Sequence, residues 1–357
     1  MSQRVDYHGP LAAGRKLTDV PFINDILGYD SLSIVGLEKN TGKTECLKYV
    51  LERLPIDTTR VAVTSIGIDG EAVDQVTRTQ KPEIVLREGM YFATSETHYR
   101  QRKLVSELID VSNETTSLGR VVTAKALTSG KIMLSGPSSG SSLKRWMAQI
   151  HNLGIDLTII DGALSRLSSA SPAVSQSMIL ATGAAFSTNL NMLVQKTAYV
   201  VHLINLEKTN EKNLSLLMPI EKGIWSIDND GQLRNLNTAT SLSQQIHLEG
   251  LENCSTLYVS GALVDGFLDK VRRDKNLRNV EIVVRDFTKV FVTPQVLKQF
   301  VKSGGRISVL QKSKLIAITV NPTSPSGYNL DSRVLCDRLE EAINLPVYDL
   351  LKNKECN

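Results

Sequence analysis

The chain has 357 residues, enough for about two domains, and its 41% hydrophobic and 22% charged residues are typical of a globular protein. A net charge of +4, without basic residues interleaved with aromatic ones, gives no indication of nucleic-acid binding. No apolar run reaches the length of a membrane span, and residues 1–15 lack the apolar core of a signal peptide. We therefore expect a cytoplasmic protein with no nucleic-acid or membrane partner.

The cysteines and histidines predict neither disulfides nor a metal site. The cysteines lie far apart and form no Cys-x-x-Cys pair, which favours a reducing compartment; they are Cys46, Cys254, Cys336 and Cys356. The five histidines are isolated, and we expect His202 to lie in the core. The basic residues between Lys270 and Lys275 are expected to form a solvated helix face.

The first clear pattern along the chain is a strand, a glycine-containing loop and a helix. It follows residues 1–30, a lead-in of uncertain structure. Leu32–Val35 is the short apolar run of a buried strand, and Gly-Leu-Glu-Lys-Asn-Thr-Gly-Lys-Thr follows at 36–44. Pro55 ends a helix whose apolar residues recur on one face, namely Leu47, Val50, Leu51 and Leu54.

This order of elements predicts a nucleotide site in the loop. Glycines allow a tight turn around an anion, and N–H groups at the helix start then point at a phosphate. Lys43 is placed to reach the β- and γ-phosphates of ATP, and Thr44 to hold Mg²⁺. Five residues separate the glycines instead of four, and Leu37 takes the usual first-glycine position, so a glycine turn without a ligand is the alternative. The predicted nucleotide-binding residues are Gly36, Asn40, Thr41, Gly42, Lys43, Thr44 and Glu45.

Strands and helices continue to alternate after this unit. Predicted strands are Val61–Thr64, Ile84–Leu86, Val121–Thr123, Ile132–Leu134, Leu157–Ile160 and Val200–Ile204. One helix is predicted from the apolar face formed by Leu143, Trp146, Met147 and Ile150. The alternation is typical of an α/β fold with a mostly parallel sheet covered by helices on both faces.

Asp161 is the candidate metal ligand. It follows the apolar strand Leu157–Ile160, at the carboxyl edge where ligands of open α/β sheets gather. There it is expected to meet Mg²⁺ together with Thr44. The alternative is a cap or turn aspartate before Gly162.

Asp69 and Glu71 form a second acidic set, after the strand Val61–Thr64. They are expected to position water or to support the metal, which makes them catalytic candidates together with Lys43. A plain turn at Asp69-Gly70 is the alternative. Lys39, inside the loop, either adds charge at the phosphates or faces solvent.

Two serine-rich segments each allow two interpretations. Ser135–Ser142 is either a second anion-binding turn or a flexible loop with a capping serine. The segment 166–177 either carries a basic finger at Arg166 and a mobile switch, or is a capped loop before a helix. That helix would contain Met178, Ile179 and Leu180.

The second half of the chain predicts a further α/β domain. A polar stretch contains the hairpin signal Asp230-Gly231. Thr293-Pro294 opens a helix that Gly304-Gly305 closes. The other elements predicted here are Leu257–Val259, Leu263–Val271, Ile282–Val284, Ile307–Leu310, Leu315–Val320 and a last helix around 334–343. The predicted division is a lead-in at 1–30, a phosphate-loop domain at 31–206, a connecting segment at 207–255 and a smaller α/β domain at 256–357.

Two families resemble this sequence. The loop spacing and the run Ile160-Asp161-Gly162-Ala163 resemble dethiobiotin synthetase and related P-loop NTPases, although Val61–Ser65 lacks their carbamate-forming lysine. Over most of the chain the sequence resembles the P-loop subunit of the reactivating factor for lysine 5,6-aminomutase. That likeness rests on Gly36–Glu45, Ile160–Arg166, Ala170–Ser175, Ala181–Ala184 and Pro346–Asp349.

The second resemblance implies an ATP-driven chaperone. Such a subunit works with a MutS-like ATPase partner and frees a B12-dependent aminomutase from damaged cobalamin. Bound ATP and Mg²⁺ would then order and release loops near the γ-phosphate. Two alternatives remain open: an ATP-dependent ligase or kinase acting on a small carboxylic acid, and a nucleotide-gated binding subunit with negligible turnover.

Overall fold

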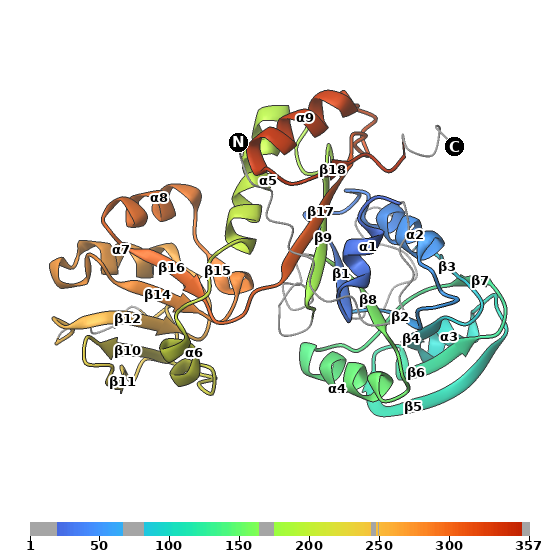
Figure 1. Cartoon of the computed structure of the whole chain (residues 1–357), viewed down its shortest axis with the longest axis horizontal. Coiled ribbons are helices and arrows are strands. Elements are labelled where there is room, and N and C mark those ends of the chain that lie inside the picture. Colours follow the sequence, from blue (N-terminus) through green and yellow to red (C-terminus); the bar gives the residue numbers. More distant parts are fainter. Residues whose placement is uncertain (1–19, 67–81, 164–174, 244–247, 249, 352–357) are drawn as a thin grey trace. The chain divides into compact units, whose positions relative to one another are not determined.

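The computed structural model describes residues 20–66, 82–163, 175–243, 248 and 250–351 (Figure 1). The described residues divide into two compact units. Of these residues, the first unit contains 20–66, 82–163, 175–197 and 314–351, and the second contains 198–243, 248 and 250–313. The chain therefore leaves the first unit and returns to it.

The first unit is built on a nine-stranded sheet with the order β18-β17-β9-β1-β8-β2-β4-β6-β5. Neighbouring strands are parallel from β18 to β4 and antiparallel from β4 to β5. The strand bounds are β1 Ser31–Gly36, β2 Val61–Ser65, β4 Tyr91–Ser95, β5 Ser106–Thr116, β6 Gly119–Ala126, β8 Leu157–Ala163, β9 Ser177–Gly183, β17 Lys314–Asn321 and β18 Val347–Tyr348. This large, mostly parallel sheet with helices confirms the predicted α/β class.

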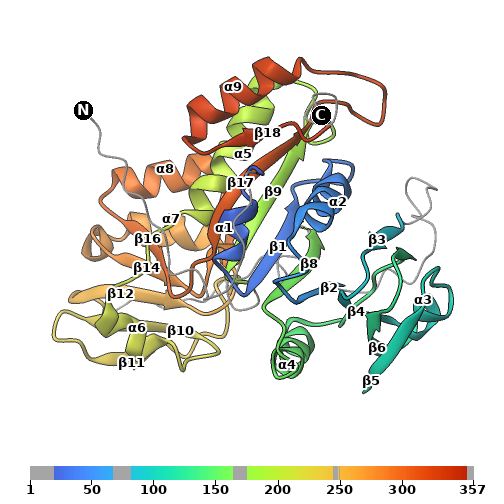
Figure 2. The same ribbon diagram turned by 45° about the vertical axis from the view of Figure 1, so that its right-hand side comes forward.

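Two helices show that both faces of this sheet are covered (Figure 2). Helix α2 (Lys43–Arg53) packs on the face of Ile34, Ile159 and Ile179, whereas α4 (Gly140–His151) packs on the face of Ala62 and Ile160. Burying apolar side chains on both faces explains why the central strands are almost uniformly apolar. The remaining elements are α1 Ile23–Leu27, α3 Glu96–Arg100, α9 Ser332–Ile343, and a separate antiparallel pair of β3 Ile84–Leu86 with β7 Gly130–Ile132. Helix α5 (Leu190–Ile204) begins in the first unit, and its residues from Ala198 on belong to the second.

The second unit has its own five-stranded sheet, with the order β11-β10-β12-β14-β16. Its core contains Leu217, Ile227, Tyr258 and Val283. The bounds are α6 Glu211–Leu217, β10 Ile224–Asp228, β11 Leu233–Asn235, β12 Cys254–Val259, β13 Leu263–Val264, α7 Asp265–Arg273, the 3-10 turns Lys275–Leu277 and Phe287–Lys289, β14 Glu281–Val284, β15 Val290–Phe291, α8 Pro294–Lys302 and β16 Arg306–Val309. The predicted hairpin is present, since β10 and β11 are antiparallel on either side of Asp230-Gly231.

The structure corrects the predicted division into domains. The stretch 207–255 is not a separate connection, because β10 pairs with β12 within the second sheet. The segment 314–357 belongs to the first unit and not to a C-terminal domain, because β17 pairs with β9 from Lys314 to Asn321, with one shift of register between Leu315 and Ala317. Without β17, the apolar strand β9 would lie at an open edge of the sheet, and pairing with β17 satisfies its backbone hydrogen-bonding groups.

Two secondary-structure predictions were wrong. Met178, Ile179 and Leu180, predicted to be helical, lie in β9 between β1 and β17. Val200–Ile204, predicted to be a strand, is the last part of the helix α5, and its His202 is exposed and not a core residue.

Among the residues that the structure describes, no helix combines the length and apolar character needed to cross a bilayer.

Candidate functional site

The loop between β1 and α2 crosses the carboxyl edge of the first sheet. Its first N–H, that of Leu37, donates to the carbonyl of Ala181 in the neighbouring strand β9 at 2.9 Å. The chain then turns back through two residues with positive φ, Asn40 at 61° and Gly42 at 89°. Asparagine and glycine are the residues that adopt this conformation most readily, so the sequence fits this turn.

Close internal packing holds the loop in this shape. The Thr41 hydroxyl is buried and donates to the carbonyl of Glu38 at 2.8 Å. A side chain at Gly36 would place its Cβ 2.8 Å from the Thr41 hydroxyl, so only glycine fits at that position without a shift of the loop. This contact gives Gly36 a steric role that differs from the phosphate contact predicted for it.

The loop ends in four consecutive N–H groups without an acceptor. Within the described part of the chain, the backbone N–H groups of Thr41, Gly42, Lys43 and Thr44 make no hydrogen bond. Gly42 caps α2 with no side-chain acceptor, and the first intrahelical bond to form is from the N–H of Cys46 to the carbonyl of Gly42. Unpaired donors at a helix start carry partial positive charge and attract anions.

Lys43 and Asp161 form an ion pair beside these donors. The Nζ atom of Lys43 lies 2.9 Å from Oδ1 of Asp161, and both side chains are partly exposed. Asp161 aligns with Ile34 of β1 and Ser65 of β2, and it lies inside β8 rather than after it. The carboxylate therefore comes from the sheet edge that the loop crosses, as predicted, although it is not a cap or turn residue.

The residues at this edge fit a magnesium ion. Oδ1 of Asp161 is buried and accepts no hydrogen bond within the described chain, because its contact with Lys43 is an ion pair without hydrogen-bond geometry. Thr44 is partly buried in the first turn of α2. Within the described residues no three acidic, histidine or cysteine side chains gather to hold a metal by themselves. One carboxylate and one hydroxyl are the kind of partial ligand set that Mg²⁺ completes with water and phosphate oxygens.

Glu45 and Lys39 are placed differently from the donors. Glu45 pairs with Lys48 at 2.8 Å, one turn further along α2, and it also lines a small hollow beside the loop. Its negative charge does not suit contact with a phosphate. Lys39 is exposed near the tip of the loop.

Several predicted residues lie elsewhere or outside the described chain. Asp69, Glu71 and Arg166 fall outside the described residues. Ser139 accepts a hydrogen bond from the N–H of Ser142 and caps α4, which supports the capping interpretation of that serine-rich segment.

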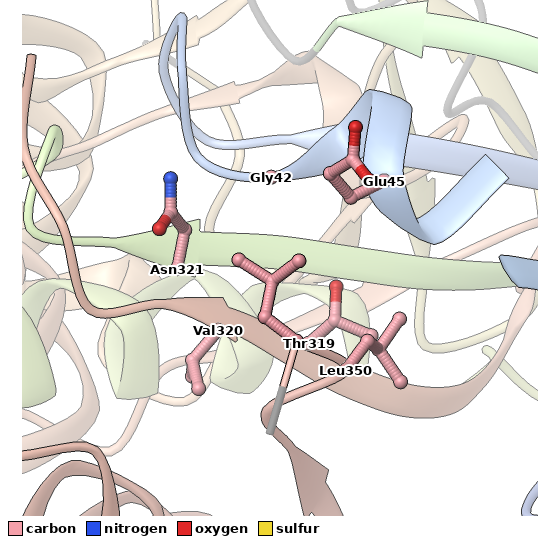
Figure 3. Close-up of a pocket in the computed structure, with 7 residues that line it drawn as sticks. Gly42, Glu45, Thr319, Val320, Asn321 and Leu350 are labelled. Atoms are coloured by element: carbon pink, nitrogen blue, oxygen red, sulfur yellow. The ribbon is translucent and has the colours of Figure 1, made fainter. Parts of the chain in front are cut away.

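Sequence reasoning missed Asn321, the last residue of β17. Its side-chain amide donates to the carbonyl of Asn40 at 2.9 Å, across a separation of 281 residues. Asn321 also lines the hollow with Gly42, Glu45 and Leu350 (Figure 3). A lone asparagine at the end of an apolar run carries no signal in the sequence that links it to this loop.

No protein-family model, curated protein or solved structure matches this chain.

Proposed function

We propose that this protein binds and hydrolyses ATP with Mg²⁺, using residues 36–44 as its phosphate loop. The observation that carries this proposal is the row of four N–H groups at 41–44 that have no acceptor among the described residues, together with the ammonium group of Lys43. Directed donors and one mobile cation together favour an anion with several adjacent charged oxygens, such as a triphosphate.

Each residue of the proposed site has a role that follows from its chemistry. The N–H groups of Thr41 to Thr44 hold phosphate oxygens, and Lys43 moves from Asp161 to the β- and γ-phosphates when nucleotide binds. Thr44 and Asp161 would hold the metal ion, which would neutralise charge on the transferring phosphoryl group. Asp69 or Glu71 positions the attacking water, which remains a prediction from the sequence.

We further propose that turnover serves protein remodelling in the cytoplasm. The client is a B12-dependent aminomutase, with a MutS-like ATPase as the partner subunit. This part rests on the family resemblance of the sequence, whereas the nucleotide chemistry rests on the geometry of the loop.

Phosphate release by the purified full-length chain tests the proposal. We expect slow release from ATP in the presence of Mg²⁺, stimulation by the partner and the aminomutase, and no dependence on added small carboxylic acids. Release that requires a small acid would instead indicate a ligase or kinase. Absence of both ATP binding and phosphate release would contradict the proposal. Recovery of the aminomutase or the MutS-like protein from the native host, stronger with a non-hydrolysable ATP analogue, would identify the client.

A further inference from the structure

Asn321 joins three pieces of backbone at the carboxyl edge of the sheet. Its side-chain amide donates to the carbonyl of Asn40, its side-chain oxygen accepts from the N–H of Thr323 at 3.1 Å, and its backbone carbonyl accepts from the N–H of Ala184 at 2.9 Å. The side chain is thus held at both ends, and its amide nitrogen is directed at the loop before α2 (Figure 3). A donor fixed in this way can orient the group that accepts from it.

The carbonyl that accepts this hydrogen bond, that of Asn40, belongs to the peptide that leads into the N–H donors of residues 41–44. In a trans peptide the carbonyl and the following N–H point in opposite directions. Holding the carbonyl of Asn40 toward Asn321 therefore turns the N–H of Thr41 away from β17. Asn40 has a φ of 61°, a conformation that costs a non-glycine residue energy and needs support from its surroundings.

Two glycines make room for this contact. A Cβ at Gly183 would lie 2.1 Å from the backbone carbonyl oxygen of Asn321, and a Cβ at Gly42 would lie 3.2 Å from the Cβ of Asn321. The close approach of β17 to the loop thus depends on small residues on both sides of Asn321. One of them, Gly42, itself carries one of the four N–H donors and lies between those of Thr41 and Lys43.

We propose that Asn321 is a positioning residue that holds the phosphate loop in its anion-binding conformation. This inference rests on the proposed function, because it assigns Asn321 to the same site. Asn321 acts through the peptide between Asn40 and Thr41 and does not contact the nucleoside. Its effect is therefore on phosphate affinity and is independent of the base.

Equilibrium titrations of the full chain with ATP, ADP and inorganic pyrophosphate, each with Mg²⁺, test this role. Asn321→Ala is expected to weaken all three by the same factor, about three- to tenfold, the size of one neutral hydrogen bond. Asn321→Asp, which keeps the acceptor for Thr323 but loses the donor, is expected to lose at least as much. The matched control is Asn329→Ala, because Asn329 is exposed and its side chain bonds only to the Thr323 hydroxyl among the described residues. Its affinities should stay within twofold of the unmodified chain.

The outcomes separate this inference from the proposed function. If Lys43→Ala weakens binding and both Asn321 variants bind normally, the positioning role is wrong and the nucleotide site stands. A loss confined to ATP and ADP, with pyrophosphate unaffected, would also overturn it, because Asn321 would then contact the nucleoside. If the unmodified chain binds none of the three ligands, both proposals fail. Thermal midpoints without ligand show whether each variant is folded.

Discussion

The Nζ atom of Lys43 lies 2.9 Å from Oδ1 of Asp161, and the two side chains are 26% and 21% exposed. Both side chains keep some contact with solvent, so water partly screens the pair, which contributes on the order of 1 kcal/mol. A polyphosphate can therefore compete with Asp161 for Lys43, and a divalent cation can compete with Lys43 for Asp161. The two charges that the proposed mechanism needs to separate are held together only weakly.

Removing the ammonium group tests the nucleotide site most directly. Lys43→Ala is expected to weaken ATP binding or turnover by at least ~10-fold, or about 1.4 kcal/mol, because its ammonium group is the cation proposed to contact the β- and γ-phosphates. Titration calorimetry with Mg-ATP measures the affinity. Lys48→Ala is the matched control, since Lys48 lies on the same helix and pairs with Glu45. Unchanged affinity and turnover in Lys43→Ala would reject the assignment.

Asp161→Asn should change the dependence on magnesium in a distinctive way. Without Mg²⁺, the variant is expected to bind ATP about two- to fivefold more tightly, because Lys43 is released from its ion pair. With Mg²⁺, it should gain less affinity than the unmodified chain, because one metal ligand is lost. Parallel titrations in Mg²⁺ and in EDTA measure both effects.

Asp156→Asn is the control for this experiment. Asp156 precedes the same strand at its opposite end and accepts from the N–H of Arg60. Its two affinities should match those of the unmodified chain. Weaker binding by Asp161→Asn in EDTA would show that Asp161 does not compete for Lys43.

Gly42→Ala separates backbone strain from the contact with β17. Gly42 has a φ of 89°, and an added Cβ would also lie 3.2 Å from that of Asn321. Gly89 has a φ of 88° with nothing within 4 Å of an added Cβ, so Gly89→Ala measures strain alone. We expect Gly89→Ala to cost about 1–2 kcal/mol of unfolding free energy and Gly42→Ala to cost more. Urea unfolding of both variants measures the difference, and equal costs would show that the contact with Asn321 is unimportant.

Cys46 should reduce stability at alkaline pH. Burial within α2 raises the pKa of its thiol from 9.0 to about 12. A raised pKa means that the folded chain holds the proton where the unfolded chain releases it, so stability is full below pH 9 and falls as pH rises toward 12. Cys46→Ala is expected to make this fall shallower by about 1 kcal/mol per pH unit between pH 9.5 and 10.5. Urea unfolding across this range measures the slopes, and identical slopes would contradict the prediction.

Local patterns in the sequence identified the parts of the fold that depend on neighbouring residues. The helical spacing of apolar residues from Leu47 on predicted α2, and Pro55 marked its end. Thr293-Pro294 marked the start of α8. Asp230-Gly231 marked the hairpin. These features are set within one or two turns of chain, where spacing and turn chemistry decide the structure.

Apolar runs without polar alternation were ambiguous. Met178–Leu180 is buried on both faces as β9, and a run of this kind is equally compatible with a buried helix. Val201 and Leu203 are buried in α5, while His202 between them is exposed. Only the pairing partners and the packing of the folded chain distinguish the two conformations.

The sequence by itself determined the strand, loop and helix around Gly42 and placed Lys43 and Asp161 at one edge of a parallel sheet. The tertiary structure alone decided that β17 returns to the first sheet and that Asn321 meets the loop across 281 residues. The physical reason is range: helix periodicity and glycine turns are encoded in adjacent residues, whereas strand order is chosen by hydrogen bonding and burial between segments far apart in the chain.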